Sequence, residues 1–264
     1  MSVPVVFVHG LWLHSDSWGP WVDLFRAEGY DPVAPGWPGD SATVEETRRK
    51  SELVVGHGID AVVEHYVKTM AGLSAKPIVI GHSFGGLIAQ RLLGQDLAAA
   101  AVAIDAAPIR GVVFLPLSAL RVASIGLRST ANKDKRAVSL TREQFRYGFG
   151  NALSQQESDE LYDRWTIPSP GRPLFEAATA NLSSRSPAKV DTGNHTRGPL
   201  LLTAGGRDHT VPPAITRSTL KQYRKSHAVT DYKHFGNRGH SLTIDSGWRE
   251  VADASIAWLR AHSL

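Results

Sequence analysis

The chain contains no cysteine. This absence excludes a disulfide framework, a thiol nucleophile, an iron–sulfur centre and any cysteine-based zinc site. At 264 residues the chain is nevertheless long enough to bury a sizeable core, so it needs neither a disulfide nor a metal ion to fold. We therefore expect a single α/β domain with room for an inserted subdomain.

A strong charge imbalance and a long apolar run are also lacking. The 29 Lys and Arg only slightly outnumber the 25 Asp and Glu and are scattered, which argues against a nucleic-acid partner. The longest apolar stretch, residues 97–104, is far shorter than the roughly 20 residues that cross a bilayer. The N-terminal residues show neither the basic segment nor the cleavage site of a signal peptide. We expect a cytoplasmic protein with a small-molecule substrate and no membrane partner, and a homo-oligomer stays possible.

Short β-branched runs alternate along the chain with segments of helical spacing. Runs without polar alternation are typical of strands buried on both faces. The expected strands are 3–8, 30–34, 77–80, 98–104, 199–203 and 228–232, and the expected helices are 18–28, 60–70 (with Asp60 as N-cap), 84–93, 212–223 and 248–259. This order predicts an α/β fold with a mostly parallel central sheet and flanking helices.

The alternation disappears between residues 108 and 198. Thr141, the Ser154–Glu157 capping box and Pro173 are typical of helix starts. About ninety residues are too many for a loop between two strands. We therefore predict a helical cap at 109–197, inserted into a core made of 1–108 and 198–264.

One motif carries a nucleophile. Gly81-His82-Ser83-Phe84-Gly85 fits G-x-S-x-G, follows a buried strand and opens a helix. A tight turn there would hold Ser83 above the sheet edge, and larger residues than glycine would collide with the neighbouring strand and helix. The helix N-terminus adds backbone N–H groups and a partial positive charge near the serine.

Here the chain resembles the α/β-hydrolase family, and within it the cap-bearing serine esterases and lactonases. Three further motifs agree with that family in chain order, namely 9–12 (His-Gly-Leu-Trp), 206–212 (Gly-Arg-Asp-His-Thr-Val-Pro) and 239–241 (Gly-His-Ser). The resemblance implies that Ser83, Asp208 and His240 act as nucleophile, acid and base. It also implies that the backbone N–H groups of Leu11 and Phe84 bind the oxyanion.

Several other residues have competing interpretations. Asp105, at the end of the 98–104 strand, is an alternative acid, because some members of the fold carry the acid there. His82 and His9 are expected to be structural, with His9 bracing the oxyanion loop. The remaining histidines near the motifs lack an i, i+4 pairing, so we expect no metal. The basic run 48–50 is expected on a solvated face.

The substrate pocket is predicted from aromatic residues. Trp12 and Trp37 lie on loops that the fold directs to the active-site edge, and Trp165 belongs to the cap. The cap also contributes Phe114, Leu115, Phe145, Tyr147 and Phe149. Together these side chains favour a hydrophobic or aromatic substrate over a sugar or phosphate. No phosphate-binding loop is present, and no cofactor is expected.

The leading hypothesis is a serine hydrolase that cleaves a carboxylic ester or a lactone of a hydrophobic small molecule through an acyl-enzyme. The same triad also suits C–C bond hydrolysis, thioester cleavage or hydroxynitrile-lyase-type chemistry. A third possibility is a non-hydrolytic receptor for small molecules. Serine at position 83 argues against dehalogenases and epoxide hydrolases, because members of the fold with those activities use a carboxylate nucleophile.

Overall fold

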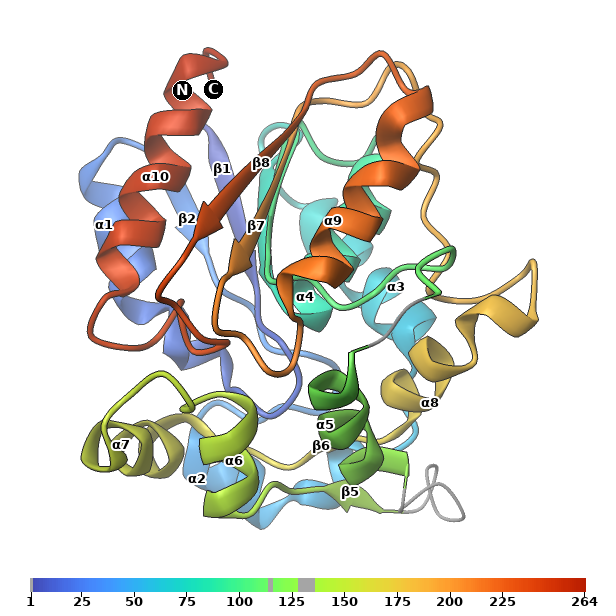
Figure 1. The fold of residues 1–264 in the computed structure, drawn as a ribbon. Coiled ribbons are helices and arrows are strands. Elements are labelled where there is room, and N and C mark those ends of the chain that lie inside the picture. Colours follow the sequence, from blue (N-terminus) through green and yellow to red (C-terminus); the bar gives the residue numbers. More distant parts are fainter. Residues whose placement is uncertain (1, 114–115, 128–135) are drawn as a thin grey trace.

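A six-stranded sheet lies at the centre of the computed structural model, which describes residues 2–113, 116–127 and 136–264 (Figure 1). All of its neighbouring strands are parallel and follow the order β2-β1-β3-β4-β7-β8. The strands are β1 (Pro4–Val8), β2 (Asp31–Val33), β3 (Ile78–His82), β4 (Ala100–Ile104), β7 (Leu200–Gly205) and β8 (Thr230–Phe235). The predicted α/β fold with a parallel sheet is confirmed.

Helices cover both faces of the sheet. One face carries α1 (Gly19–Ala27) and α10 (Trp248–Ala261), and the other carries α3 (Ile59–Met70), α4 (Phe84–Gly94) and α9 (Pro213–Gln222) (Figure 1). Each face has its own hydrophobic core. Along β1, Val5 and Phe7 pack into one core while Val6 and Val8 pack into the other, because successive strand residues point to opposite faces.

The segment between β4 and β7 is mainly helical and lies beyond the carboxyl ends of the strands (Figure 1). It contains α5 (Leu117–Leu127), β5 (Ala137–Val138), α6 (Arg142–Gly148), α7 (Gln155–Trp165), β6 (Ser169–Pro170) and α8 (Arg172–Ala178). The β5–β6 ribbon is antiparallel and was not predicted. The domain boundaries at 108 and 198 stay a prediction, and we call residues 109–197 the cap segment below.

Two helix starts differ from the expectation. The N-cap of α3 is Gly58 rather than Asp60, and the carboxylate of Glu176 in α8 accepts the N–H of Ile59 at 2.7 Å. Asp60 instead pairs with Arg91 of α4. At α7, Ser154 accepts the N–H of Glu157 as predicted, but the Glu157 carboxylate binds the N–H of Ser246 and does not close a capping box. Both differences arise from contacts between segments distant in sequence.

Arg48 joins the core to the cap segment. It lies in α2 (Val44–Arg49) and is exposed, as expected for the basic run. Its guanidinium nevertheless donates to the carbonyl groups of Thr166 and Asp163, both at 2.8 Å, at the end of α7. A cation there also interacts favourably with the negative end of the helix dipole.

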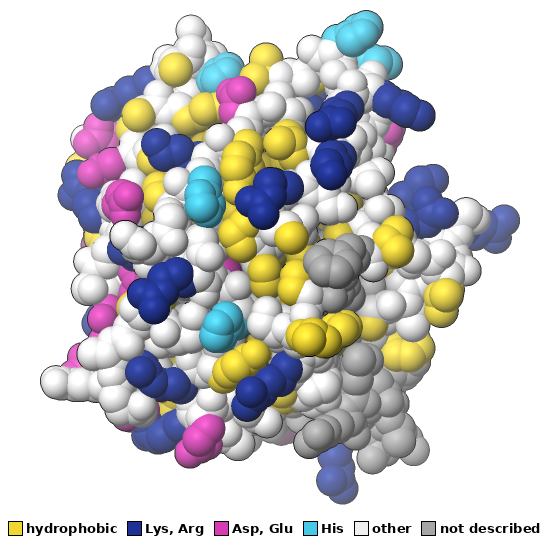
Figure 2. All heavy atoms as spheres, in the orientation of Figure 1, with side chains coloured by type: hydrophobic (Ala, Val, Ile, Leu, Met, Phe, Trp, Pro, Cys, Tyr) yellow, Lys and Arg dark blue, Asp and Glu magenta, His cyan; other side chains and the backbone are white. Residues whose placement is uncertain are grey.

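Two observations relate to the charge and hydropathy of the sequence. Lys and Arg side chains stand mostly singly among hydrophobic and uncharged groups on the face drawn in Figure 2. Among the helices of the described residues, none is both long and apolar enough to cross a membrane.

Candidate active site

Ser83 stands on a strained turn between β3 and α4. Its φ of 54° and ψ of −119° lie in a region that residues with side chains rarely occupy. The turn is possible because Gly81 and Gly85 carry no side chain. A Cβ on Gly81 would lie 2.1 Å from the carbonyl oxygen of Gly85, and one on Gly85 would lie 2.0 Å from that of Val8. The backbone of β3, β1 and α4 therefore packs closely beneath the serine.

His240 and Asp208 form a buried pair. Nδ1 of His240 lies 2.6 Å from Oδ2 of Asp208, and Oδ1 of the same carboxylate accepts the N–H groups of Thr210 and Val211 at 2.7 and 2.8 Å. Burial by itself raises the pKa of Asp208, but the electrostatic interaction with His240 and the hydrogen bonds from His240, Asp105 and the N–H of Val211 outweigh it and hold the pKa below the usual value. Asp208 is therefore ionised and able to orient the imidazole.

The other ring nitrogen of His240 is free to act. Within the described part of the chain, Nε2 is buried and has no hydrogen-bond partner. The ring of His82, the residue before Ser83, lies 4.6 Å from that of His240, and Nε2 of His82 is 2.8 Å from the carbonyl oxygen of His240. Burial, and next the electrostatic interaction with His240, hold the pKa of His82 well below its usual range. His82 is therefore neutral. As a hydrogen-bond donor to the carbonyl of His240, it positions the backbone of that residue.

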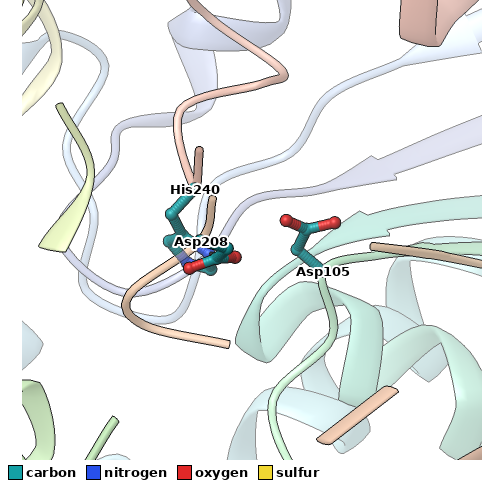
Figure 3. A group of neighbouring side chains, drawn as sticks. All are labelled: Asp105, Asp208 and His240. Atoms are coloured by element: carbon teal, nitrogen blue, oxygen red, sulfur yellow. Dashed lines mark hydrogen bonds and ion pairs between the residues drawn. The ribbon is translucent and has the colours of Figure 1, made fainter. Parts of the chain in front are cut away.

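Asp105 lies beside this pair but forms no hydrogen bond to His240 among those that the structure describes. Both of its carboxyl oxygens accept the N–H of Gly205, at 3.1 and 3.0 Å. Burial and the adjacent carboxylate of Asp208 raise the pKa of Asp105 well above the usual value, which favours its protonated form. Figure 3 shows the three side chains converging from separate segments. In this arrangement Asp208, not Asp105, holds His240.

Asp105, Asp208 and His240 are also the one group of three potential metal ligands found among the described residues, with one ligand atom of each within 4.8 Å of the others. Their donor atoms suit a cation poorly. Nδ1 of His240 and the carboxylate of Asp208 are hydrogen-bonded to each other. Asp105 is a weak ligand, because its raised pKa favours the protonated form. Hydrogen bonding within the group accounts for the cluster without a metal.

Two backbone N–H groups flank Ser83. Phe84 is the first residue of α4, and Leu11 follows Gly10 in the loop after β1. Neither amide donates a hydrogen bond to any residue that the structure describes. A Cβ on Gly10 would lie 2.8 Å from Cβ of Ser83, so the loop that carries Leu11 packs directly against Ser83.

A cavity of about 280 Å³ opens beside Ser83. It lies between the turn that carries the serine and helices α5, α8 and α9. Its lining consists of Trp12, Ser83, Phe84, Ala107, Pro108, Ala119, Leu120, Val122, Ala123, Leu174, Ala177, Ala178, Thr210, Val211 and Ile215. None of these lining residues is charged, so the cavity suits an apolar group.

The sequence matches the alpha/beta hydrolase family over residues 5–254. The chain belongs to this family. None of the proteins with curated descriptions matches it in sequence.

Solved structures of other alpha/beta hydrolases share the fold at low sequence identity. A monoacylglycerol lipase from Paleococcus ferrophilus is 19% identical, with a TM-score of 0.66 over 99% of this chain and 97% of the lipase. A methylesterase from Arabidopsis is 16% identical, with a TM-score of 0.65 over 99% of both chains. A thermophilic esterase from Thermogutta terrifontis is 18% identical, with a TM-score of 0.64 over 99% of this chain and 90% of the esterase. These similarities establish the architecture.

In this hydrolase, one of the three tryptophans predicted to line the pocket lies at the cavity. Trp12 belongs to the lining, whereas Trp37 and Trp165 are not among the described residues that form it. The indole of Trp37 instead donates to the carbonyl of His9 at 3.1 Å and packs on that ring. Trp165 lines a separate surface depression with Trp248.

The cap aromatics mostly have other partners. Phe145 and Phe149 are buried and stacked, and Phe149 lies with its ring 4.8 Å from that of His240. Tyr147 packs against Arg121 and His209. Phe114 and Leu115 lie outside the described residues. Small side chains of α5 and α8 form much of the wall, and nothing in their local sequence distinguishes them from ordinary core residues.

Proposed function

We propose that this hydrolase is a serine esterase that cleaves carboxylic esters, lactones included, of apolar small molecules through an acyl-enzyme. The observation that carries the proposal is the state of His240. Its Nδ1 is fixed by an ionised, buried Asp208, while its Nε2 has no partner among the described residues and its ring lies 4.6 Å from that of His82, the residue before Ser83. An imidazole held in this way is suited to accept a proton from a serine hydroxyl.

In the proposed reaction, Oγ of Ser83 attacks the ester carbonyl carbon and transfers its proton to Nε2 of His240. The amides of Leu11 and Phe84 bind the negative oxygen of the tetrahedral intermediate, each contributing roughly 3 kcal/mol to lowering the barrier. The intermediate collapses when His240 returns the proton to the departing alcohol. A water molecule then repeats the sequence on the acyl-enzyme and releases the acid.

The cavity supports an apolar substrate group. Its lining has no charged residue, and apolar surface continues outward from it along α5. Leu120 lines the cavity with 44% of its surface exposed, and Leu117, one turn earlier, is 85% exposed. A hydrophobic acyl or alcohol group is expected to gain most from this surface.

The first test uses a fluorophosphonate probe, which forms a covalent bond with activated serine hydroxyls. We expect the purified protein to be labelled at Ser83 and the Ser83→Ala variant not to be labelled. Labelling that persists in Ser83→Ala would show that the nucleophile lies elsewhere.

Substrate class needs a second measurement. We expect a panel of aryl esters, lactones and thioesters of graded size to give turnover with esters or lactones of apolar acids. A protein that is labelled at Ser83 but turns over only thioesters, or none of the panel, would contradict the ester assignment.

A further inference from the structure

All three hydrogen-bonding groups of Trp12 are held by the cap segment. Its backbone N–H donates to Oγ of Ser169 at 2.6 Å. Its carbonyl accepts the N–H of Ile167, and its indole N–H donates to the carbonyl of Val138, both at 3.0 Å. These partners lie at least 126 positions away in the sequence, and Trp12, Val138 and Ser169 are buried.

The attachment extends along the loop after β1. The N–H of His14 donates to the carbonyl of Trp165 at 3.0 Å, and Leu13 forms an antiparallel bridge with Thr166. On the cap side, Ser169 and Val138 face each other across the β5–β6 ribbon. Residues 12–14 are therefore paired with the cap segment almost like one strand with another.

Trp12 needs this external support. Its φ of 67° lies in the left-handed region, which a bulky aromatic residue rarely occupies. Such a conformation persists only where the surroundings determine it. The partners available to Trp12 for this purpose come from the cap segment, because each of its hydrogen bonds ends there.

The peptide group whose N–H is bound by Ser169 is next in the chain to the peptide group that carries the N–H of Leu11. The Ser169 hydroxyl binds the N–H of the Leu11–Trp12 peptide, so it restricts rotation about ψ of Leu11. On the other side, Gly10 is packed against Ser83. The orientation of the Leu11 amide thus depends on a contact with the core at Gly10 and a contact with the cap at Ser169.

We propose that Ser169 is a positioning residue for ester hydrolysis: through Trp12 it orients the Leu11 amide toward the oxyanion. This inference rests on the proposed function, since it assumes that the Leu11 amide binds a developing negative charge. Ser169 itself is not among the residues that line the cavity beside Ser83. Its effect is exerted on the geometry of the transition state, where amide donors must already be aligned.

The test compares Ser169→Ala with the wild-type protein on p-nitrophenyl butyrate. Removing an oxyanion donor outright lowers kcat by about 10²–10³-fold. For a donor that is misaligned rather than removed, we expect kcat to fall by about 10–100-fold, with KM changed by less than about threefold. Ser169→Thr keeps the hydroxyl and is expected to retain most of the activity.

A pair of inhibitors separates positioning from general damage. An alkyl trifluoromethyl ketone forms a tetrahedral adduct with an active serine, whereas the amide of the same length stays planar. We expect Ser169→Ala to weaken binding of the ketone by the same factor as kcat/KM and to leave binding of the amide unchanged. Equal losses for both inhibitors would indicate a distorted cavity and would overturn the proposal.

Two further variants guard against misfolding. Ser169→Cys keeps the size of the side chain but is a weak acceptor, in a protein with no other cysteine, and we expect the same kinetic loss. Ser158→Ala is the matched control, because Ser158 is a buried serine of the cap segment whose hydroxyl has no partner among the described residues. We expect it to behave as wild type.

The outcomes distinguish the role of Ser169 from the proposed function. A wild-type protein that the fluorophosphonate does not label at Ser83 contradicts the proposed function and, with it, the role of Ser169. A labelled wild-type protein with folded Ser169→Ala and Ser169→Cys variants of unchanged kcat and ketone affinity contradicts the role of Ser169 alone.

Discussion

Asp105 and Asp208 follow adjacent parallel strands and lie next to each other, yet their pKa values are shifted in opposite directions. His240 and the N–H of Val211 lower the pKa of Asp208, whereas burial and the charge of Asp208 raise the pKa of Asp105. Two carboxylates this close cannot both hold a charge at low cost. The member of the pair with the raised pKa is the one that lacks the imidazole, and this difference leads to two of the predictions below.

The first prediction separates the two acids kinetically. Asp208→Asn places an amide against Nδ1 of His240 and favours the wrong tautomer, so we expect kcat to fall by roughly 10³–10⁴-fold. Asp105→Asn replaces a neutral acid by a neutral amide, and we expect less than about a tenfold loss. Ester kinetics on both variants, with circular dichroism to check folding, provide the measurement. The reverse ranking would assign the acid to Asp105.

The second prediction concerns stability and pH. Folding raises the pKa of Asp105, so the folded protein keeps a proton there that the unfolded chain has lost above about pH 4. The stabilisation from this group is complete below the usual aspartate pKa and decreases as pH rises toward the raised value. Asp208, with a lowered pKa, acts in the opposite sense, and its contribution is lost as the pH falls through that lowered value.

Urea unfolding between about pH 5 and 8 measures the effect of Asp105, because Asp208 is ionised in both states over that range. We expect the free energy of unfolding of the wild type to decrease with rising pH relative to Asp105→Asn. Parallel curves for the two proteins would mean that Asp105 is ionised in the folded state.

The third prediction concerns the triad as a unit. Ser83→Ala is expected to remove essentially all ester turnover, and adding His240→Ala is expected to cost little more, because the two groups act in the same step. Steady-state rates for the two single variants and the double variant form the test. A folded Ser83→Ala protein that keeps more than about a tenth of the wild-type rate contradicts covalent catalysis.

The fourth prediction concerns substrate size. Ala177 lines the cavity from α8, and Ala177→Phe would fill part of it. We expect kcat/KM for hexanoyl and octanoyl esters to fall relative to acetyl esters by about 10–200-fold. Ala257→Phe, the same change at an exposed position of α10, is the control and should leave the ranking unchanged.

A change at Trp165 provides a contrast with Ala177→Phe. This side chain lies at a different depression, so Trp165→Ala is expected to scale all esters together while lowering stability. If Trp165→Ala changes the ranking of esters and Ala177→Phe does not, the substrate does not occupy the cavity beside Ser83.

Local sequence predicts the fold and the residues of the candidate site better than it predicts the pocket. Ser83 stands out because a serine between glycines, placed where a buried strand turns into a helix, is typical of a nucleophile. Asp208 and His240 follow late strands, and parallel strands bring their carboxyl ends to one edge. These motifs can therefore be assigned without knowledge of the side-chain packing.

The features that differ from the sequence-based expectations depend on contacts between distant segments. The position of Trp37 on a loop near the active-site edge predicts that its side chain lines the pocket. The contacts of the indole with His9 set the direction of this side chain instead. The start of α3 is fixed by Glu176, which lies 117 residues later than Ile59. Ser169 gives no sequence signal either, since a serine before a proline resembles any loop. Such pairings arise only when the chain is folded.

The attachment of Trp12 has a consequence for protein engineering. Cap segments are attractive units to exchange between members of a fold, since they contribute to substrate choice while the core keeps the chemistry. In this hydrolase the exchange would remove the groups that now bind the N–H, the carbonyl and the indole of Trp12, and the new cap would have to supply others in the same places. A working chimera would have to take residues 10–14 and residues 109–197 from the same protein, because these two segments pair in the structure although they are separate in the sequence.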